Sequence, residues 1–140
     1  MAVPLSRYLA PIVSSMLDQV DVVCPVPLHH RRLRKRGFNQ ALELLRAVER
    51  ALIEKRHGQI VCDALLRKVD TPALGHGSPV ARARVVAGAF VVPRPASVAA
   101  KHVLVLDDVM TSGATLAECA RTLLAVGAVR VSVAVLARAL

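Results

Sequence analysis

The run from Val103 to Thr115, Val-Leu-Val-Leu-Asp-Asp-Val-Met-Thr-Ser-Gly-Ala-Thr, constrains the fold more than any other part of the sequence. Its first four residues are all apolar, which is typical of a strand covered on both faces in the middle of a parallel sheet. Asp107 and Asp108 follow where that strand would end, and Thr115-Leu-Ala-Glu118 has the spacing of a capping box at a helix start. The stretch therefore predicts a strand, a short loop and a helix in a fold of the α/β class.

The predicted loop is suited to holding a phosphate at the carboxyl end of the strand, where open α/β sheets bind their ligands. It offers the hydroxyls of Thr111, Ser112 and Thr115, a glycine at 113 that permits close approach, and backbone N–H groups at a helix start. The two acids beside it would repel a phosphate but accept hydrogen bonds from vicinal hydroxyls. We therefore expect a ligand that carries both a phosphate and a ribose diol.

The same stretch resembles the phosphoribosyl pyrophosphate (PRPP) motif of type I phosphoribosyltransferases. The resemblance implies that Asp107 and Asp108 are catalytic residues that hold the ribose hydroxyls. The residues implied for the 5′-phosphate are Thr111, Ser112, Gly113, Ala114 and Thr115. Two alternatives are a buried strand followed by an ordinary capped helix, and the Walker B strand of a nucleotide hydrolase. A Walker B strand needs a phosphate-binding loop of the form G-x-x-x-x-G-K-[ST], and the sequence contains none. The dinucleotide-binding pattern G-x-G-x-x-G is absent as well.

Length and hydropathy favour one domain over residues 1–140. Aromatic residues make up only 2% of the chain against 54% hydrophobic residues, so the core must consist of Val, Leu, Ile and Ala. Residues 1–20 have apolar side chains at helical spacing, interrupted by Pro11, and predict an amphipathic helix rather than a signal peptide. No apolar run is long enough to insert into a membrane. We expect a cytoplasmic protein.

The net charge of +9 predicts an anionic partner, which a polyphosphate substrate and a nucleic acid both satisfy. Cys24, Cys62 and Cys119 lie in apolar segments without a C-x-x-C pair, and we expect buried thiols in a reducing compartment. The five histidines lack metal-ligand spacing and are expected at the surface or in loops. The sequence thus predicts no direct metal site.

Residues 21–27 predict a short strand that must stop near Cys24 or Pro25, because proline cannot continue a central ladder. From Val26 onward the run Val-Pro-Leu-His-His-Arg-Arg-Leu-Arg-Lys-Arg-Gly-Phe-Asn-Gln resembles ComF-type phosphoribosyltransferase-like proteins, which are linked to natural competence and DNA uptake. In type I enzymes the loop after the first strand binds pyrophosphate. By position, the resemblance implies Pro25, Val26 and Pro27 for this loop, with the N–H of Val26 facing the anion.

The stretch after this loop is the most basic of the chain, and its anion contacts would come from Arg31, Arg34 and Arg36. Either the leaving-group phosphates or a nucleic-acid backbone could meet these side chains. Residues 40–57 then predict a helix and residues 59–66 a strand, which completes the strand-helix-strand unit of a parallel sheet. Further elements are a strand over 88–93, a helix over 116–126 that stops at Gly127, and a last strand over 129–135 with alternating valines.

Residues 67–87 are rich in turn formers and predict a flexible loop. In type I phosphoribosyltransferases a hood at this point closes over the reacting centre and excludes water. Arg82 and Arg84 would reach the pyrophosphate from it. Leu74 stands where ComF-like chains commonly carry Gln, and the cysteine-rich zinc module with which they often begin does not occur in this sequence.

The resemblance as a whole implies the type I phosphoribosyltransferase fold, a mostly parallel central sheet flanked by helices with a flexible hood loop. It implies a glycosyltransferase that binds PRPP, takes Mg²⁺ through PRPP, and transfers the phosphoribosyl group to an unidentified acceptor. The alternative is a non-catalytic PRPP- or nucleotide-binding competence protein that contacts single-stranded DNA through its arginine-rich loop. With Tyr8, Phe38 and Phe90 as the only aromatic residues, such a contact would be electrostatic and salt dependent. A regulatory protein that binds nucleotides and RNA is a third reading, and a homodimer stays open.

Overall fold

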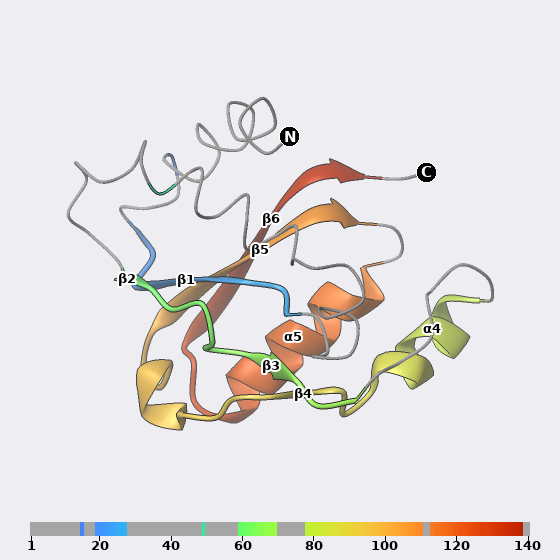
Figure 1. The fold of residues 1–140 in the computed structure, drawn as a ribbon, viewed down its shortest axis with the longest axis horizontal. Coiled ribbons are helices and arrows are strands. Elements are labelled where there is room, and N and C mark those ends of the chain that lie inside the picture. Colours follow the sequence, from blue (N-terminus) through green and yellow to red (C-terminus); the bar gives the residue numbers. More distant parts are fainter. Residues whose placement is uncertain are drawn as a thin grey trace.

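A parallel sheet forms the centre of the computed structural model, which describes residues 15, 19–27, 49, 59–69, 78–110 and 113–138 (Figure 1). Within this part of the chain the sheet has the strand order β2-β1-β5-β6, and all its pairings are parallel. The strands are β1 (Val22–Pro25), β2 (Gln59–Ile60), β5 (His102–Met110) and β6 (Arg130–Arg138). The predicted α/β fold with a parallel central sheet is confirmed. The predicted helices over 1–20 and 40–57 lie almost wholly outside the described residues.

The two central strands carry the core. Val103, Leu104, Val105 and Leu106 of β5 have no exposed surface, which confirms a strand covered on both faces. The 12-residue helix α5 (Ala114–Ala125) packs against β5 and β6 (Figure 1). Its buried apolar side chains, Leu116, Cys119 and Leu123, join those of β1 and β5 in one cluster. Burial of this shared apolar surface holds the helix on the sheet.

Both ends of α5 are set by glycine. Gly113 is the N-cap residue, with a left-handed φ of 80° and no side-chain cap, so the predicted capping box at Thr115 is wrong. At the other end Gly127 has φ 105°, and its N–H donates to the Leu124 carbonyl at 3.1 Å. The Ala128 N–H donates to the Leu123 carbonyl at 3.2 Å, which completes a Schellman motif. The predicted stop at Gly127 is therefore confirmed.

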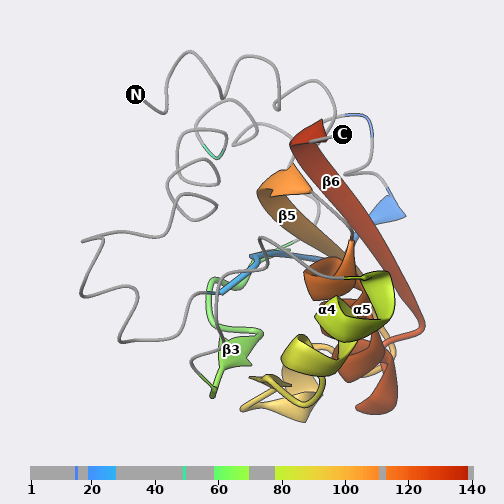
Figure 2. The same ribbon diagram turned by 90° about the vertical axis from the view of Figure 1, so that its right-hand side faces the viewer.

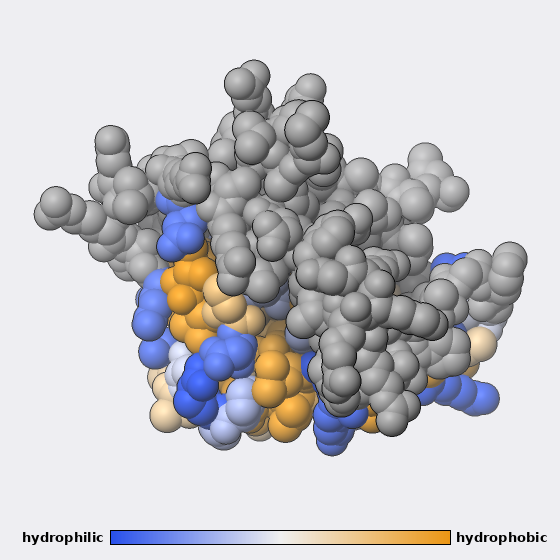
Figure 3. Space-filling model, in the orientation of Figure 1, coloured by the Kyte–Doolittle hydropathy of each residue, from blue (hydrophilic) through white to orange (hydrophobic). Residues whose placement is uncertain are grey.

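A second, two-stranded sheet pairs β3 (Leu66–Arg67) with β4 (Phe90–Val91) in antiparallel fashion. Arg67 and Phe90 are buried, whereas Leu66 and Val91 are 44% and 37% exposed. Figure 3 shows apolar side chains at the surface in the part of the molecule where β3 and β4 lie. A 3₁₀ turn, η3 (Pro95–Ser97), follows on the way to β5.

The single strand predicted over 59–66 is wrong, because the chain turns between two sheets. The segment from Cys62 to Leu65 forms this turn, and Asp63 in it makes a two-fold ion pair with Arg94, at 2.5 and 3.0 Å. Cys62 lies in this turn and is exposed, so the burial predicted for it is wrong, whereas Cys24 and Cys119 are buried as predicted.

The segment predicted as a flexible loop over 67–87 contains the eight-residue helix α4 (Pro79–Val86). The Ser78 hydroxyl caps it by accepting from the Ala81 N–H at 3.1 Å, and a proline occupies the first helical position. Ser-Pro thus acts as a helix start rather than as a helix breaker. α4 packs against α5, as Figures 1 and 2 show. Residues 70–77 lie outside the described part.

The faces of two elements differ from the predicted ones. The apolar spacing of the last helix predicts Leu116, Ala120, Leu123 and Leu124 on one face, but Leu124 is 50% exposed and Cys119 is buried instead. In β6 the alternation holds only in part, because Val133 is 43% exposed while Ala134 is buried. β6 is the last strand in the order of the described sheet, so it is covered less fully than β5.

His102 is buried at the start of β5, which contradicts the surface position expected for the histidines. Its Nδ1 contacts the Gln19 carbonyl and its Nε2 lies 2.7 Å from the Ser132 hydroxyl. Its backbone N–H donates to the Asp21 carboxylate at 2.9 Å. Two polar partners for the ring explain how an imidazole can occupy this position.

Among the described helices, none combines the length and the apolar composition that crossing a bilayer requires.

Candidate functional site

The carboxyl end of β1 lies beside Leu106 of β5, four residues before β5 ends. Pro25 pairs with Leu106 in the parallel ladder, and the Val26 N–H donates to the Leu106 carbonyl at 2.9 Å. The predicted pyrophosphate loop therefore begins next to Asp107. The same hydrogen bond corrects one expectation, because the Val26 N–H joins the sheet and is not directed at an anion. Pro25, Val26 and Pro27 are all buried, as the continuation of the ladder requires.

The sequence predicts that Asp107 and Asp108 end the strand, but the strand continues beyond them. β5 continues to Met110 because β6 pairs with it as far as Arg138. Asp107 is half-buried and lies opposite Val135 of β6. Asp108 belongs to β5 by its backbone, and its side chain lies outside the described part.

Burial raises the pKa of the Cys24 thiol to about 12. The pKa of Cys119 is raised as well, by burial first and then by the charges of Cys24 and Asp107. These thiols are therefore neutral and inert beneath the acid pair. Within the described ranges, no group of three or more His, Cys, Asp or Glu side chains is arranged to hold a metal ion.

The start of α5 follows the acid pair closely. Thr111 and Ser112 lie outside the described residues, whereas Gly113, Ala114 and Thr115 form the first turn of the helix. The first N–H groups of a helix have no partner within the helix and carry partial positive charge. With its left-handed φ, Gly113 turns the chain from the strand into this helix. A helix N-terminus thus lies at the same edge of the sheet as Asp107, which is an arrangement that can hold an anion.

The predicted anion contacts divide into two groups. Arg31, Arg34 and Arg36 lie outside the described residues. Arg82 and Arg84 lie on α4, which packs against α5. Arg84 is exposed, and the Nε–H of the half-buried Arg82 is shielded from solvent without a hydrogen-bond partner in the described part of the chain. An unpaired donor of this kind is costly unless another group binds to it.

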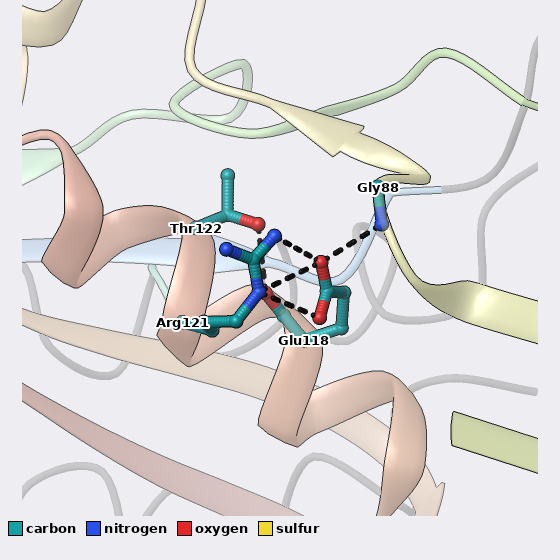
Figure 4. A network of polar contacts seen from close by, with 4 residues as sticks. All are labelled: Gly88, Glu118, Arg121 and Thr122. Atoms are coloured by element: carbon teal, nitrogen blue, oxygen red, sulfur yellow. Dashed lines mark hydrogen bonds and ion pairs between the residues drawn. The ribbon is translucent and has the colours of Figure 1, made fainter. Parts of the chain in front are cut away.

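A polar network on α5, which the sequence did not predict, joins the site to the segment that carries α4 (Figure 4). The Glu118 carboxylate accepts from the Gly88 N–H at 3.0 Å and from Arg121 Nε at 2.9 and 3.1 Å. The Thr122 hydroxyl donates to the Glu118 carbonyl at 2.8 Å. The pKa of Glu118 is lowered, chiefly by Arg121 and also by the Gly88 N–H, against the effect of burial. The capping-box spacing drew attention to Glu118 but indicated the wrong partner.

Arg67 is a second charged residue that the sequence did not single out. It is 9% exposed, and its guanidinium lies over the Phe90 ring at 5.3 Å from the centroid. The aromatic face stabilises a cation in this position. Its charge also lowers the pKa of Cys119, against the larger effect of burial.

Comparison with known proteins identifies the sequence family and relatives. Residues 41–140 match the family described as phosphoribosyl transferase domain. The DNA utilization protein YhgH of Escherichia coli O157:H7 is 38% identical over 124 residues, which are 89% of this chain and 52% of that protein. The YhgH protein of Salmonella typhimurium is 35% identical over 127 residues, 91% of this chain and 53% of the relative. The chain spans about half the length of these curated relatives.

Solved structures show the same fold at low sequence identity. The glutamine PRPP amidotransferase from B. subtilis superposes with a TM-score of 0.61 at 17% identity, over 96% of this chain and 26% of that one. A hypoxanthine phosphoribosyltransferase from Staphylococcus aureus superposes with a TM-score of 0.52 at 13% identity, over 94% and 61%. The chain therefore belongs to the phosphoribosyl transferase domain family, which confirms the recognition of its sequence motifs.

Proposed function

We propose that this chain binds PRPP as its Mg²⁺ complex and transfers the phosphoribosyl group to an acceptor. One observation carries the proposal: β5, which bears Asp107, leads through only Thr111 and Ser112 to Gly113 at the start of α5. A carboxylate near the end of a strand and the helix N-terminus that follows it in the chain suit a ligand with a diol and a phosphate, which are the two ends of ribose 5-phosphate. Membership of the phosphoribosyl transferase domain family supports the same function.

Each part of the proposed site has a task in this reaction. Asp107 and Asp108 accept hydrogen bonds from the ribose hydroxyls, and residues 111–115 hold the 5′-phosphate. The bond between C1 of the ribose and pyrophosphate breaks, the pyrophosphate leaves with the electron pair, and a bond from C1 to the acceptor forms. Positive charge develops on the sugar in the transition state. Carboxylates fixed beside the ribose stabilise that charge without having to reorganise.

The leaving group needs cations on its other side. We assign this part to Arg82 and Arg84 of α4, whose guanidinium groups are suited to phosphate oxygens. The loop over Pro25–Pro27 offers no N–H for this task, because Val26 donates to Leu106 and the prolines have none. Mg²⁺ bound to PRPP neutralises charge on the pyrophosphate. The residues present fit this ion, because Mg²⁺ prefers substrate phosphates, water and one or two carboxylates to a protein cage. Among the described side chains no such cage exists.

Thermal unfolding with and without Mg²⁺ and PRPP tests the pocket. At about 100 times its dissociation constant, PRPP should add about 2.7 kcal/mol to the free energy of unfolding. Asp107→Asn should weaken binding roughly 10- to 100-fold, because it removes a charged hydrogen-bond acceptor. Asp21→Asn is the matched control, since Asp21 directly precedes β1, at the opposite edge of the sheet. No shift for the wild-type protein, or equal shifts for the two variants, would refute PRPP binding at this site.

Turnover separates an enzyme from a PRPP sensor. Pyrophosphate release is measured after addition of nucleobases and of amines, with PRPP and Mg²⁺ present. A transferase releases pyrophosphate with at least one acceptor class and loses this activity in Asp107→Asn. A protein that binds PRPP and stays silent with the whole panel is a sensor, and the transfer step is then excluded.

Contact with single-stranded DNA is a second proposed function, favoured by the net charge of +9 and by relatives that are DNA utilization proteins. We assign it to Arg31, Arg34 and Arg36, and expect the contacts to be with phosphates. Each phosphate contact to a single strand contributes about −0.7 to the slope of log affinity against log salt. The triple substitution to alanine should therefore flatten the slope by about 2. A slope near zero in the wild-type protein would exclude this function.

A further inference from the structure

The segment from 69 to 88, which carries α4, is closed at its base. Leu66 and Arg67 of β3 pair with Val91 and Phe90 of β4, and the Lys68 N–H donates to the Ala89 carbonyl at 2.8 Å. Both ends of the segment are therefore connected to the β3–β4 ladder. The position of α4 depends on where this base is attached to the rest of the molecule.

Glu118 attaches the base to α5. Its Oε1 accepts from the N–H of Gly88, the residue with φ 72° that joins α4 to β4 (Figure 4). Arg121 holds the carboxylate from the other side, at 2.5 to 3.1 Å. Glu118 is only 8% exposed, whereas the Arg121 side chain is 62% exposed. The part-buried bond to Gly88 is thus the one that joins α5 to the turn after α4, and Arg121 keeps its acceptor charged.

The two elements that Glu118 joins bear the two halves of the proposed ligand site. α5 begins at the proposed 5′-phosphate site, and α4 carries Arg82 and Arg84. We propose that Glu118 is a positioning residue that fixes α4 relative to the N-terminus of α5 and so aligns its arginines with the pyrophosphate of PRPP. This inference rests on the proposed function. Glu118 itself touches no substrate.

Binding of two ligands distinguishes a positioning role of Glu118 from a general loss of structure in the Glu118→Ala variant. Mg²⁺-PRPP meets both halves of the site, whereas ribose 5-phosphate lacks the pyrophosphate and meets only the acid pair and the phosphate loop. In Glu118→Ala the affinity for Mg²⁺-PRPP should fall about tenfold or more, as is usual for supporting residues. The affinity for ribose 5-phosphate should stay within about twofold, since the bonds of the Glu118 carboxylate among the described residues go to Gly88 and Arg121. Equal losses for the two ligands, or none for Mg²⁺-PRPP, would overturn the inference.

Two further variants of the same network act as controls. Glu118→Gln keeps an oxygen that accepts from Gly88 and should recover most of the PRPP affinity, to within about threefold of wild type. Arg121→Ala leaves the Gly88 bond in place and should stay within about threefold as well, because its side chain is exposed. A loss in Arg121→Ala as large as in Glu118→Ala would contradict a role that acts through Gly88.

A double-mutant cycle tests whether Glu118 acts through α4. The double substitution Arg82→Ala and Arg84→Ala should weaken the binding of Mg²⁺-PRPP but not that of ribose 5-phosphate. Adding Glu118→Ala to it should cause no further loss of affinity for Mg²⁺-PRPP. Additive losses would refute the pathway through α4. Amide hydrogen exchange of α4 and Gly88, measured without ligand, should accelerate in Glu118→Ala. A wild-type protein that binds neither ligand refutes the proposed function, and hydrogen exchange then decides by itself whether Glu118 holds the segment.

Discussion

Ala100 and Gly127 are joined by a backbone hydrogen bond and both have left-handed backbone, so glycine should be favoured over alanine at each of them. Ala100 has a left-handed φ of 62°, and its N–H donates to the carbonyl of Gly127, whose φ is 105°. For an alanine the left-handed region costs about 1–2 kcal/mol. The entropy that glycine adds to the unfolded chain offsets about 0.4–1 kcal/mol of this. Ala100→Gly should therefore raise the free energy of unfolding by about 0.5–1 kcal/mol.

Gly127→Ala should do the reverse. A Cβ at this position would meet Ala99 at 3.6 Å, an ordinary contact, so the cost comes from the backbone and not from a clash. Alanine pays the cost of left-handed backbone, and part of this cost is offset because alanine has less entropy than glycine in the unfolded chain. The free energy of unfolding should therefore fall by about 0.5–1.5 kcal/mol.

Urea unfolding measures both variants. With an m-value of about 2 kcal/mol/M, the midpoint should rise by roughly 0.3–0.5 M for Ala100→Gly and fall by a similar or larger amount for Gly127→Ala, with m unchanged. Midpoints that move in the same direction would refute the argument from backbone conformation.

Acidification and thiol chemistry give two further predictions. Arg121 lowers the pKa of Glu118 in the folded protein, so this carboxylate stabilises the fold above its ordinary pKa, and the contribution is lost as the pH falls through the lowered value. Urea unfolding at pH 6 and pH 3 should show a smaller loss of stability in Glu118→Gln than in wild type, and an equal loss would contradict this. In the native protein a maleimide should modify Cys62 alone, because Cys24 and Cys119 are buried, and a second thiol labelled before unfolding would disprove their burial.

The sequence predicts a feature correctly where interactions between residues close in the chain determine the structure. Val103 to Leu106 lie in the middle of the sheet because nothing in the run tolerates water on either face. α5 ends at Gly127 because a left-handed residue there satisfies the last carbonyls of the helix. Both features depend on residues within a few positions of each other, and both were predicted correctly.

Non-local pairing produced the errors. The strand expected over 59–66 divides because Leu66 finds its partner in Val91, 25 residues further on, and no local pattern marks that choice. The sequence does not predict α4, because Asp70-Thr-Pro-Ala-Leu-Gly-His-Gly-Ser-Pro79 has the composition of a single turn-forming run. Its last two residues are in fact the cap and first position of a helix that is stabilised by packing on α5.

Glu118 shows how a correct motif can indicate the wrong contact. Three residues after Thr115 it has the spacing of a capping box, and in an isolated helix its carboxylate would bind the N–H at the helix start. In this fold Gly113 begins the helix with left-handed backbone, so Glu118 lies further along and the helix start needs no side-chain cap. The carboxylate instead accepts from Gly88, 30 residues away. Glu118 therefore does not cap the N-terminus of α5, which keeps this carboxylate away from the helix start where we propose a phosphate site.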